Sequence, residues 1–291
     1  KSIKSTIALM PGMDITVLQA DEALALSELT PTEMMAQTFV VPSRPIDRPR
    51  DLLRGVYRLS TKDDSPLDLP DVGYQRVVSR DGNALVVVID YAEPEAAPQR
   101  PAAGYLQASP TLNYEDEAIQ RLVREVLELA EQYPDRPRQE ILAVSAWAAV
   151  KDYLQTKDLS VGFATASEVA RTRQGDCTEH AVLLAAVLRG LGIPSRCVSG
   201  LVYADRFAGH QDIFVYHMWT QAWIESDEEG SSRWQDFDAT LPGRGVEFDA
   251  THIALSVSDM NDGLLSNGMA ALLPLLGNLE IEVVATAYID E

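Results

Sequence analysis

The sequence predicts an α+β fold, because two kinds of hydrophobic periodicity occupy separate stretches of the chain. Residues 35–92 consist of short apolar runs between turn residues, a pattern typical of strands. Residues 114–190 instead repeat their apolar side chains at helical spacing. Alternating, strand-like segments return after residue 195. Helices followed by consecutive strands favour a domain in which helices pack on an antiparallel sheet.

The N-terminal part is expected to form a small β-rich accessory domain over residues 1–100, without a catalytic constellation of its own. Residues Val17–Leu29 fit either an extra helix or an irregular lead-in. Asp81-Gly82-Asn83 supplies a hairpin turn between the last two candidate strands. The Pro-rich segment Glu93–Pro101 is expected to be a linker. The candidate strands are Thr38–Val41, Leu52–Leu59, Tyr74–Ser79 and Ala84–Tyr91.

A second domain is expected over residues 106–291. Its first helix ends before Pro134, which cannot continue a helix. The expected helices are Tyr114–Gln132, Gln139–Leu154, Ala166–Arg171, and one that begins at Cys177 and is stopped by Gly190, Gly192 and Pro194. The expected strands are Arg196–Tyr203, Tyr216–Glu225 and Arg233–Ala239, followed by a helical segment at Gly268–Leu276 and a strand at Leu279–Tyr288.

Composition narrows the classes of function. The 291 residues are 46% hydrophobic, which supports a folded core, and carry a formal net charge of −20. Such acidity disfavours binding to nucleic acid or to an anionic membrane surface. No apolar stretch approaches the roughly 20 residues that cross a bilayer, so we expect no membrane insertion. The first five residues do not read as a signal peptide. The unpaired cysteines fit either the cytoplasm or the periplasm, and the sequence predicts no particular oligomeric state.

Cys177 carries the main indication of chemistry, because it lies at the start of the most apolar helical run. Asp176 is a good N-cap and Glu179 stands three residues later, which is the spacing of a capping box. The first N–H groups of a helix and its macrodipole stabilise a thiolate, the nucleophile of cysteine acyl-transfer enzymes. The only other cysteine, Cys197, is then expected to be an unpaired, buried small hydrophobe.

A base and a carboxylate follow on a predicted hairpin. His217, Trp219 and Gln221 share one face of a strand, and Asp236 and Asp238 share one face of the returning strand. A histidine at one end of such a hairpin can meet an aspartate at the end of the returning strand. An imidazole can hold a thiolate as an ion pair, and a carboxylate can fix its tautomer.

Four motifs, in this order, resemble those of the transglutaminase-like superfamily, whose core has a papain-like cysteine-protease architecture. They are Arg173-Gln174-Gly175-Asp176-Cys177-Thr178-Glu179-His180, Leu191–Arg196, His217-Met218-Trp219, and Trp234–Thr240. The resemblance covers roughly residues 110–250, and the N-terminal part resembles only in layout the accessory domains of bacterial members. It implies Cys177 as nucleophile, His217 as base and acid, and Asp238 as orienting carboxylate. Ala239 departs from the proline that commonly follows this aspartate.

The resemblance implies an enzyme that breaks or exchanges an amide bond of a peptide or protein substrate through a thioester on Cys177, without a cofactor or metal. Hydrolysis and acyl transfer share every step up to the thioester, so both stay open. A binding or assembly module that retains the fold is the alternative.

Several neighbouring residues have weaker indications. Trp219, Gln174 and His180 are candidates for substrate binding, each beside a member of the expected triad. Asp236 is the rival of Asp238 as the orienting carboxylate. Cys177-x-x-His180 also fits half of a metal site, but no second pair of ligands accompanies it. His252 follows the returning strand and could approach the site.

Overall fold

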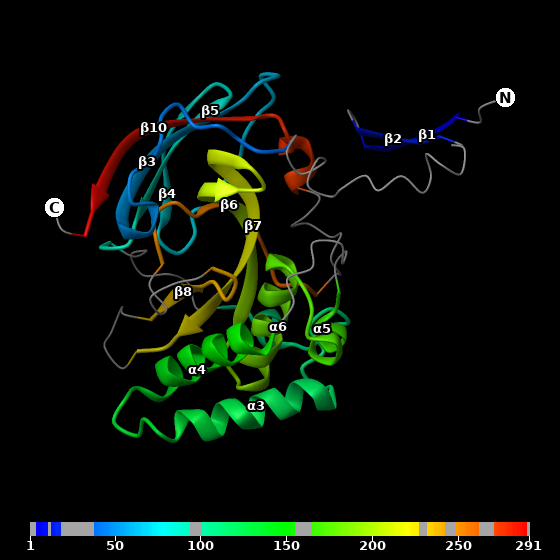
Figure 1. Ribbon diagram of the computed structural model, residues 1–291, viewed down its shortest axis with the longest axis vertical. Coiled ribbons are helices and arrows are strands. Elements are labelled where there is room, and N and C mark those ends of the chain that lie inside the picture. The colour runs from blue at the N-terminus through cyan, green and yellow to red at the C-terminus, as the bar shows by residue number, and fades with distance from the viewer. Residues whose placement is uncertain are drawn as a thin grey trace.

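The computed structural model of the chain describes residues 4–10, 13–18, 38–93, 101–154, 164–226, 232–241, 248–261 and 271–289. Within them the chain has the expected α+β architecture, with antiparallel sheets and helices packed on one of the sheets (Figure 1). The strands β1 (Lys4–Met10) and β2 (Met13–Leu18) pair only with each other, as a separate two-stranded sheet.

The first larger sheet has the order β10-β3-β5-β4, and each neighbouring pair is antiparallel. The predicted hairpin is confirmed, because Asp81 pairs with Ala84 and leaves Gly82 and Asn83 as the turn. Gly82 has φ +61°, which favours glycine at this position. The strands are β3 (Leu52–Thr61), β4 (Gln75–Asp81), β5 (Ala84–Asp90) and β10 (Leu279–Tyr288).

The second larger sheet has the order β8-β7-β6-β9 and is also antiparallel. Its strands are β6 (Ser195–Phe207), β7 (His210–Ile224), β8 (Arg233–Phe237) and β9 (Ile253–Ser258). The described residues also form four α-helices: α3 (Glu117–Ala130), α4 (Arg138–Tyr153), α5 (Ala166–Thr172) and α6 (Cys177–Gly190). Short 3₁₀ turns occur at Pro49–Asp51, Ala103–Leu106 and Leu273–Leu275.

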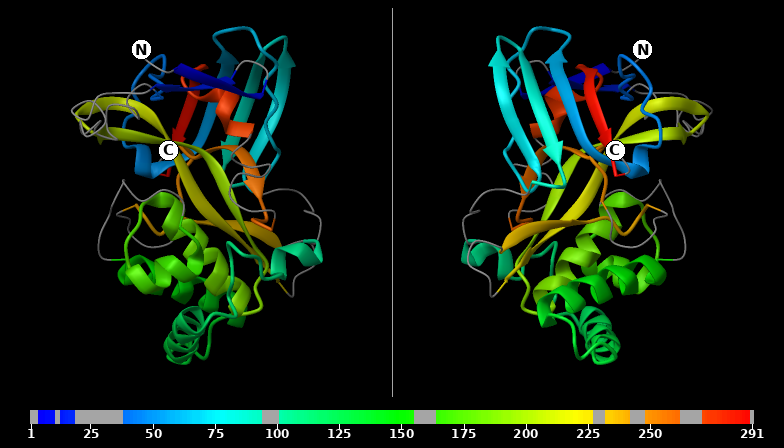
Figure 2. Two further views of the ribbon diagram at one scale, coloured as in Figure 1. Left: turned by 90° about the vertical axis from the view of Figure 1, so that its right-hand side faces the viewer. Right: turned by 90° about the vertical axis from the view of Figure 1, so that its left-hand side faces the viewer.

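The second sheet lies between the helices and the first sheet (Figures 1 and 2). The long strand β7 contributes to both cores at different points along its length. Met218 and Ala222 belong to the core that contains the helices, whereas Phe214 belongs to the core of the first sheet. Helix α6 is central, with Glu179–Arg189 buried along its length. The start of α6 and the middle of β7 are therefore held in a rigid interior.

The strand β10 comes late in the chain but pairs with the early strand β3. The predicted strand Leu279–Tyr288 is confirmed, but it pairs with β3 and lies in the sheet of the N-terminal residues. Leu279, Ile281 and Val283 are buried in the same core as Leu59 and Ile89. The division into units of residues 1–100 and 106–291 stays a prediction, with one strand of the second range completing the first sheet.

Other differences have local causes. Thr38–Val41 forms only one bridge, between Val40 and Phe214, and β9 was not expected. The hairpin of β6 and β7 extends beyond its predicted strands, because its polar end is exposed on both faces and shows no alternation. Parts of Val17–Leu29, Glu93–Pro101 and Gly268–Leu276 lie outside the described residues.

Two further findings concern the second cysteine and the helices. Cys197 is buried and forms no disulfide, as expected, and burial raises the pKa of its thiol to about 12. Among the described residues, no helix has both the length and the hydropathy to cross a bilayer.

Candidate active site

The start of α6 presents the side chain of Cys177. The capping box predicted from the sequence is formed, because the Asp176 carboxylate accepts from the first turn and Glu179 Oε2 accepts from the Asp176 N–H at 3.0 Å. Gly175 has φ +156°, and a Cβ there would lie 2.2 Å from Glu179 Cβ. Only glycine fits between this backbone and the buried Glu179, so Gly175 fixes the approach to the helix. Cys177 is half-buried, hence reachable from outside.

His217 lies in the middle of β7, opposite Gly200 of β6. A Cβ at Gly200 would lie 2.8 Å from the Trp219 ring, so the missing side chain leaves room for that ring beside His217. The rings of His217 and Trp219 are stacked, with centroids 6.3 Å apart. The tryptophan thus limits how far the imidazole can rotate.

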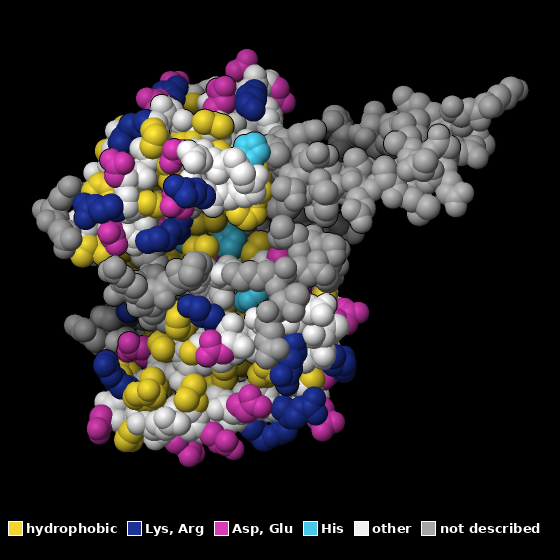
Figure 3. Space-filling model, viewed as in Figure 1, with side chains coloured by type: hydrophobic (Ala, Val, Ile, Leu, Met, Phe, Trp, Pro, Cys, Tyr) yellow, Lys and Arg dark blue, Asp and Glu magenta, His cyan; other side chains and the backbone are white. Residues whose placement is uncertain are grey.

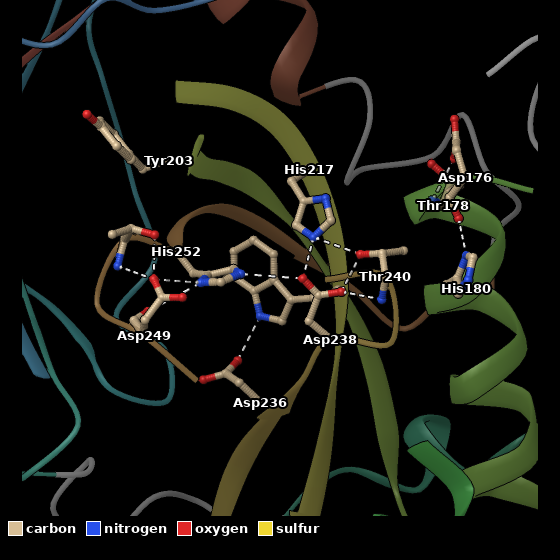
Figure 4. A network of polar contacts seen from close by, with 12 residues as sticks. Asp176, Thr178, His180, Tyr203, His217, Asp236, Asp238, Thr240, Asp249 and His252 are labelled. Atoms are coloured by element: carbon tan, nitrogen blue, oxygen red, sulfur yellow. Dashed lines mark hydrogen bonds and ion pairs between the residues drawn. The ribbon is translucent and has the colours of Figure 1, made fainter. Parts of the chain in front are cut away.

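Asp238 follows directly after β8 and points back at His217. Its Oδ2 lies 2.7 Å from His217 Nε2, and its Oδ1 accepts from the Thr240 N–H at 2.8 Å and from the Thr240 hydroxyl (Figure 4). The Trp147 ring of α4 donates to the Asp238 carbonyl at 2.7 Å. The carboxylate is therefore held on both oxygens and through its backbone.

The two ring nitrogens of His217 have different partners. Nε2 is engaged by Asp238, and the ring also hydrogen-bonds the thiol of Cys177, for which Nδ1 is the nitrogen left. Burial disfavours the charged ring, but the Asp238 carboxylate and the bond to Cys177 outweigh it and raise the pKa of His217 to about 10. Burial likewise disfavours the Asp238 carboxylate, yet the two neighbouring histidines hold its pKa well below the ordinary value. The pair therefore exists as an imidazolium and a carboxylate.

A second histidine lies on the other side of Asp238. His252 Nε2 is 3.5 Å from Asp238 Oδ2, and its Nδ1 is 3.4 Å from Asp249 Oδ1. Asp249 in turn accepts from the exposed Arg50 at 2.6 Å, so alternating charges run from Arg50 to the buried His217. Figure 4 shows the buried part of this series, from Asp249 to His217. Burial opposes the charge on His252, but Asp249 and Asp238 raise its pKa. The sequence placed His252 after the returning strand without identifying these contacts, because the strand β9, which begins directly after His252, was not predicted.

Asp236, the rival carboxylate, has other partners. Its Oδ1 accepts from Trp219 Nε1 at 2.8 Å and from Gln221 Nε2 at 2.7 Å, and its Oδ2 from the Tyr91 hydroxyl at 3.3 Å. Burial raises the pKa of Asp236, whereas that of Asp238 is lowered. Among the described contacts, Asp238 and not Asp236 bonds the His217 ring.

The three candidates for substrate binding lie in different surroundings. His180 lines the cavity beside Cys177, and its Nδ1 contacts the Asp176 carbonyl at 2.6 Å. Trp219 is only 3% exposed and is bonded to Asp236, so it supports the site from behind. Gln174 is exposed on the turn before α6. A role of any of them in binding substrate stays a prediction.

One group of described residues has the donor atoms of a metal site. The donor atoms of His217, Asp238 and His252 lie within 4.8 Å of one another. However, the 2.7 Å between His217 Nε2 and Asp238 Oδ2 is a hydrogen-bond distance, whereas two ligands of a tetrahedral zinc lie about 3.3 Å apart. The group is thus arranged to hold a proton between these two atoms, and the site residues present fit acid–base chemistry.

Two cavities open at the Cys177–His217 pair. The larger, of about 380 Å³, lies along β6 and β7, and the smaller, of about 120 Å³, lies against Leu272, Leu273 and Leu276. Figure 3 shows histidine and hydrophobic side chains together on the hollowed face of the molecule. A thiol, an imidazole, a carboxylate and space on two sides of the thiol are the parts that acyl transfer through sulfur requires.

Comparison with known proteins agrees with this geometry. Residues 127–239 match the family model of the transglutaminase-like superfamily. A segment of 87 residues is 32% identical to human protein-glutamine gamma-glutamyltransferase 4, covering 23% of this chain and 13% of that protein.

Two solved structures are similar to the chain at low identity. The periplasmic domain of TgpA from Pseudomonas aeruginosa, bound to ethylmercury, is 15% identical with a TM-score of 0.46 and covers 75% of this chain and 97% of that one. Red sea bream transglutaminase is 13% identical with a TM-score of 0.33 and covers 69% and 47%.

The matched segment runs from the end of α3 to the residue after Asp238, so it contains the cysteine, the histidine and the aspartate just described. The protein thus has the general fold of the cysteine hydrolases and acyltransferases. Within that class, residues 127–239 match the transglutaminase-like superfamily.

Proposed function

We propose that the chain is a cysteine-dependent enzyme that hydrolyses amide bonds of peptides or proteins, with acyl transfer to an amine as the competing outcome. The observation that carries the proposal is the contact series Cys177–His217–Asp238, in which His217 bonds the thiol on one side and the carboxylate on the other. His252 is assigned to hold the far side of Asp238.

In the first half of the reaction, the Cys177 sulfur attacks the carbonyl carbon and a C–S bond forms. The oxyanion is stabilised by the Cys177 backbone N–H, one of the first N–H groups of α6, which have no partner within the helix. His217 gives the proton on Nδ1 to the leaving nitrogen as the C–N bond breaks. Asp238 keeps the ring in this tautomer throughout.

In the second half, water or an amine attacks the thioester carbonyl. His217 removes a proton from the attacking group, the C–S bond breaks, and the thiolate is restored beside the imidazolium. Attack by water gives a carboxylic acid and attack by an amine gives a new amide. The name of the human relative describes glutamyl transfer, and this supports keeping the amine as second candidate.

The test compares two cysteine variants. Peptide substrates are incubated with a labelled primary amine, and products are identified by mass. We expect Cys177→Ala to abolish both product formation and the trapped thioester, and Cys197→Ala, at the buried cysteine, to retain them. Acid products from the native chain indicate hydrolysis, and labelled products indicate transfer.

Iodoacetamide labelling separates the enzyme from a binding module with the same fold. At pH 6 an ordinary thiol, with a pKa of about 8.5, reacts slowly. We expect Cys177 to react at pH 6 at least about tenfold faster than a free cysteine peptide, because His217 keeps a positive charge beside it. Equal rates, together with no turnover, would favour the binding module.

A further inference from the structure

The larger cavity beside Cys177 has an apolar wall that follows from strand alternation. On β7, Val215 and Ile213 lie on the same face as His217. Their partners on β6 are Val202 and Ala204. Val202, Ile213 and Val215 form a buried apolar cluster, onto which Ala204, Phe207 and Leu241 pack. A continuous apolar surface therefore begins at the candidate catalytic histidine.

Two of the charged groups that line this cavity, Arg50 and Asp176, are already engaged. Arg50 lines the cavity, but its guanidinium bonds the Asp249 carboxylate and the Tyr203 carbonyl. Asp176 also lines it, and its carboxylate caps α6. The exposed Asp205 and Arg206 lie farther along β6. A polar side chain buried next to the cysteine would lose its hydrogen bonds to water without gaining these groups as partners. An apolar side chain has no such hydrogen bonds to lose.

The two cavities also differ in what they can hold. The larger measures about 380 Å³ and the smaller about 120 Å³, which is the volume of about four water molecules. The acyl group stays on the sulfur while the second reactant enters, so it needs the cavity with more room. The smaller cavity has space for water or for the end of an amine.

We propose that the 380 Å³ cavity binds a bulky apolar side chain on the residue that supplies the reacting carbonyl. This inference rests on the proposed function and names its substrate class: peptides with Leu, Met or Phe on the acyl side of the bond. Apolar pockets that gain a few methylenes discriminate by about 10- to 100-fold. We therefore expect kcat/KM for a Leu donor to exceed that for an Asn donor of the same size by about this factor.

The experiment uses a peptide series that varies only the acyl-side residue, among Leu, Phe, Asn and Ala, and a second series that varies only the amine side. The variant Ala204→Phe fills the cavity from a half-buried position. Gln211→Phe is the matched control, because Gln211 is exposed on the same hairpin. We expect Ala204→Phe to lower kcat/KM for Leu and Phe donors at least about tenfold and for the Ala donor less than about twofold. Gln211→Phe should change none of them.

The inference is overturned if the native chain shows no acyl-side preference, if the preference lies on the amine side, or if Ala204→Phe lowers all donors equally while its circular dichroism is native. Should Ala204→Phe not fold, Leu241→Ser, at a half-buried wall position, must reduce the Leu preference.

A second readout does not depend on turnover. Protection of Cys177 from iodoacetamide by N-acetyl-leucinamide, but not by N-acetyl-asparaginamide, supports the cavity even where no amide is cleaved. In that case the proposed function fails and the binding inference stands. If the chain turns over amides but the leucine and asparagine compounds do not differ in protection or in rate, the proposed function stands and the binding inference fails.

Discussion

Replacing Asp238 by Asn would remove the charge of the carboxylate while keeping its shape. Asp238 Oδ2 lies 2.7 Å from His217 Nε2, and both side chains are buried. The rise in the pKa of His217 from 6.5 to about 10 corresponds to about 5 kcal/mol in favour of the protonated ring, shared between Asp238 and Cys177. Asp238 is the larger contributor. Without it, burial is opposed only by Cys177, and the pKa of His217 must fall.

The His217 titration can be followed directly, because the chain has four histidines whose C2 protons NMR can resolve. In Asp238→Asn we expect the pKa of His217 to fall by at least two units. Alkylation of Cys177 at pH 6 should then slow at least about tenfold, because the imidazolium beside the sulfur is lost. We expect kcat/KM to fall by about 10²–10⁴-fold, the range of general acid–base catalysis.

Asp236→Asn is the matched control, since Asp236 is a buried carboxylate two residues away that contacts Trp219, Gln221 and Tyr91 but not His217 in the described contacts. It should leave the His217 titration within a few tenths of a unit of the native value. The reasoning is refuted if the His217 titration is unchanged in Asp238→Asn, or if Asp236→Asn moves it as far.

Three further variants test the surroundings of the site. His252→Gln removes a positive charge from beside Asp238, so the pKa of that carboxyl should rise. We expect kcat to fall about 3- to 10-fold at unchanged KM, and the acidic limb of the kcat–pH profile to move to higher pH. A purely structural role of His252 would lower only Tm. Gly175→Ala meets Glu179 Cβ at 2.2 Å and should cost about 2–3 kcal/mol in urea unfolding, against about 1 kcal/mol for Gly192→Ala, which has φ +77° but no neighbour within 4 Å. Burial raises the pKa of Glu179 to about 7, so the contribution of this group to stability is present below pH 4.5 and is lost as the pH rises through 7. Between pH 5 and 8 the free energy of unfolding should therefore fall by about 1–2 kcal/mol more in the native chain than in Glu179→Gln. Equal losses in the two chains would contradict this.

The position of Cys177 at the start of α6 could be predicted from the sequence because its signals are local. The capping box at Asp176 and Glu179 spans four residues, and helix starts depend mainly on such neighbours. The alternation around His217 likewise predicted that Trp219 and Gln221 share a face, and both donate to Asp236.

The choice between Asp236 and Asp238 could not be made from local signals. Both residues point to one side of a strand, and two facts of the tertiary structure separate them. The strand β8 ends at Phe237, and Thr240 then holds Asp238 toward His217. The contact of His252 with Asp238 was not predicted for a similar reason, because the position of His252 depends on β9 pairing with β6, and β9 is a buried strand without alternation.

The pairing of β10 with β3 has a consequence for how the molecule is made. Thr61 and Leu279 are neighbours in the sheet, yet a ribosome that adds about 5–20 residues per second needs roughly 10–45 seconds to travel from one to the other. Until β10 is made, one edge of β3 has no partner strand. Arg50, which precedes β3 and pairs with Asp249, is then next to an incomplete sheet. The ion pair of Arg50 with the buried Asp249 therefore gains the support of a complete sheet only when translation of this segment is nearly over, so the surroundings of the candidate site are completed late in synthesis.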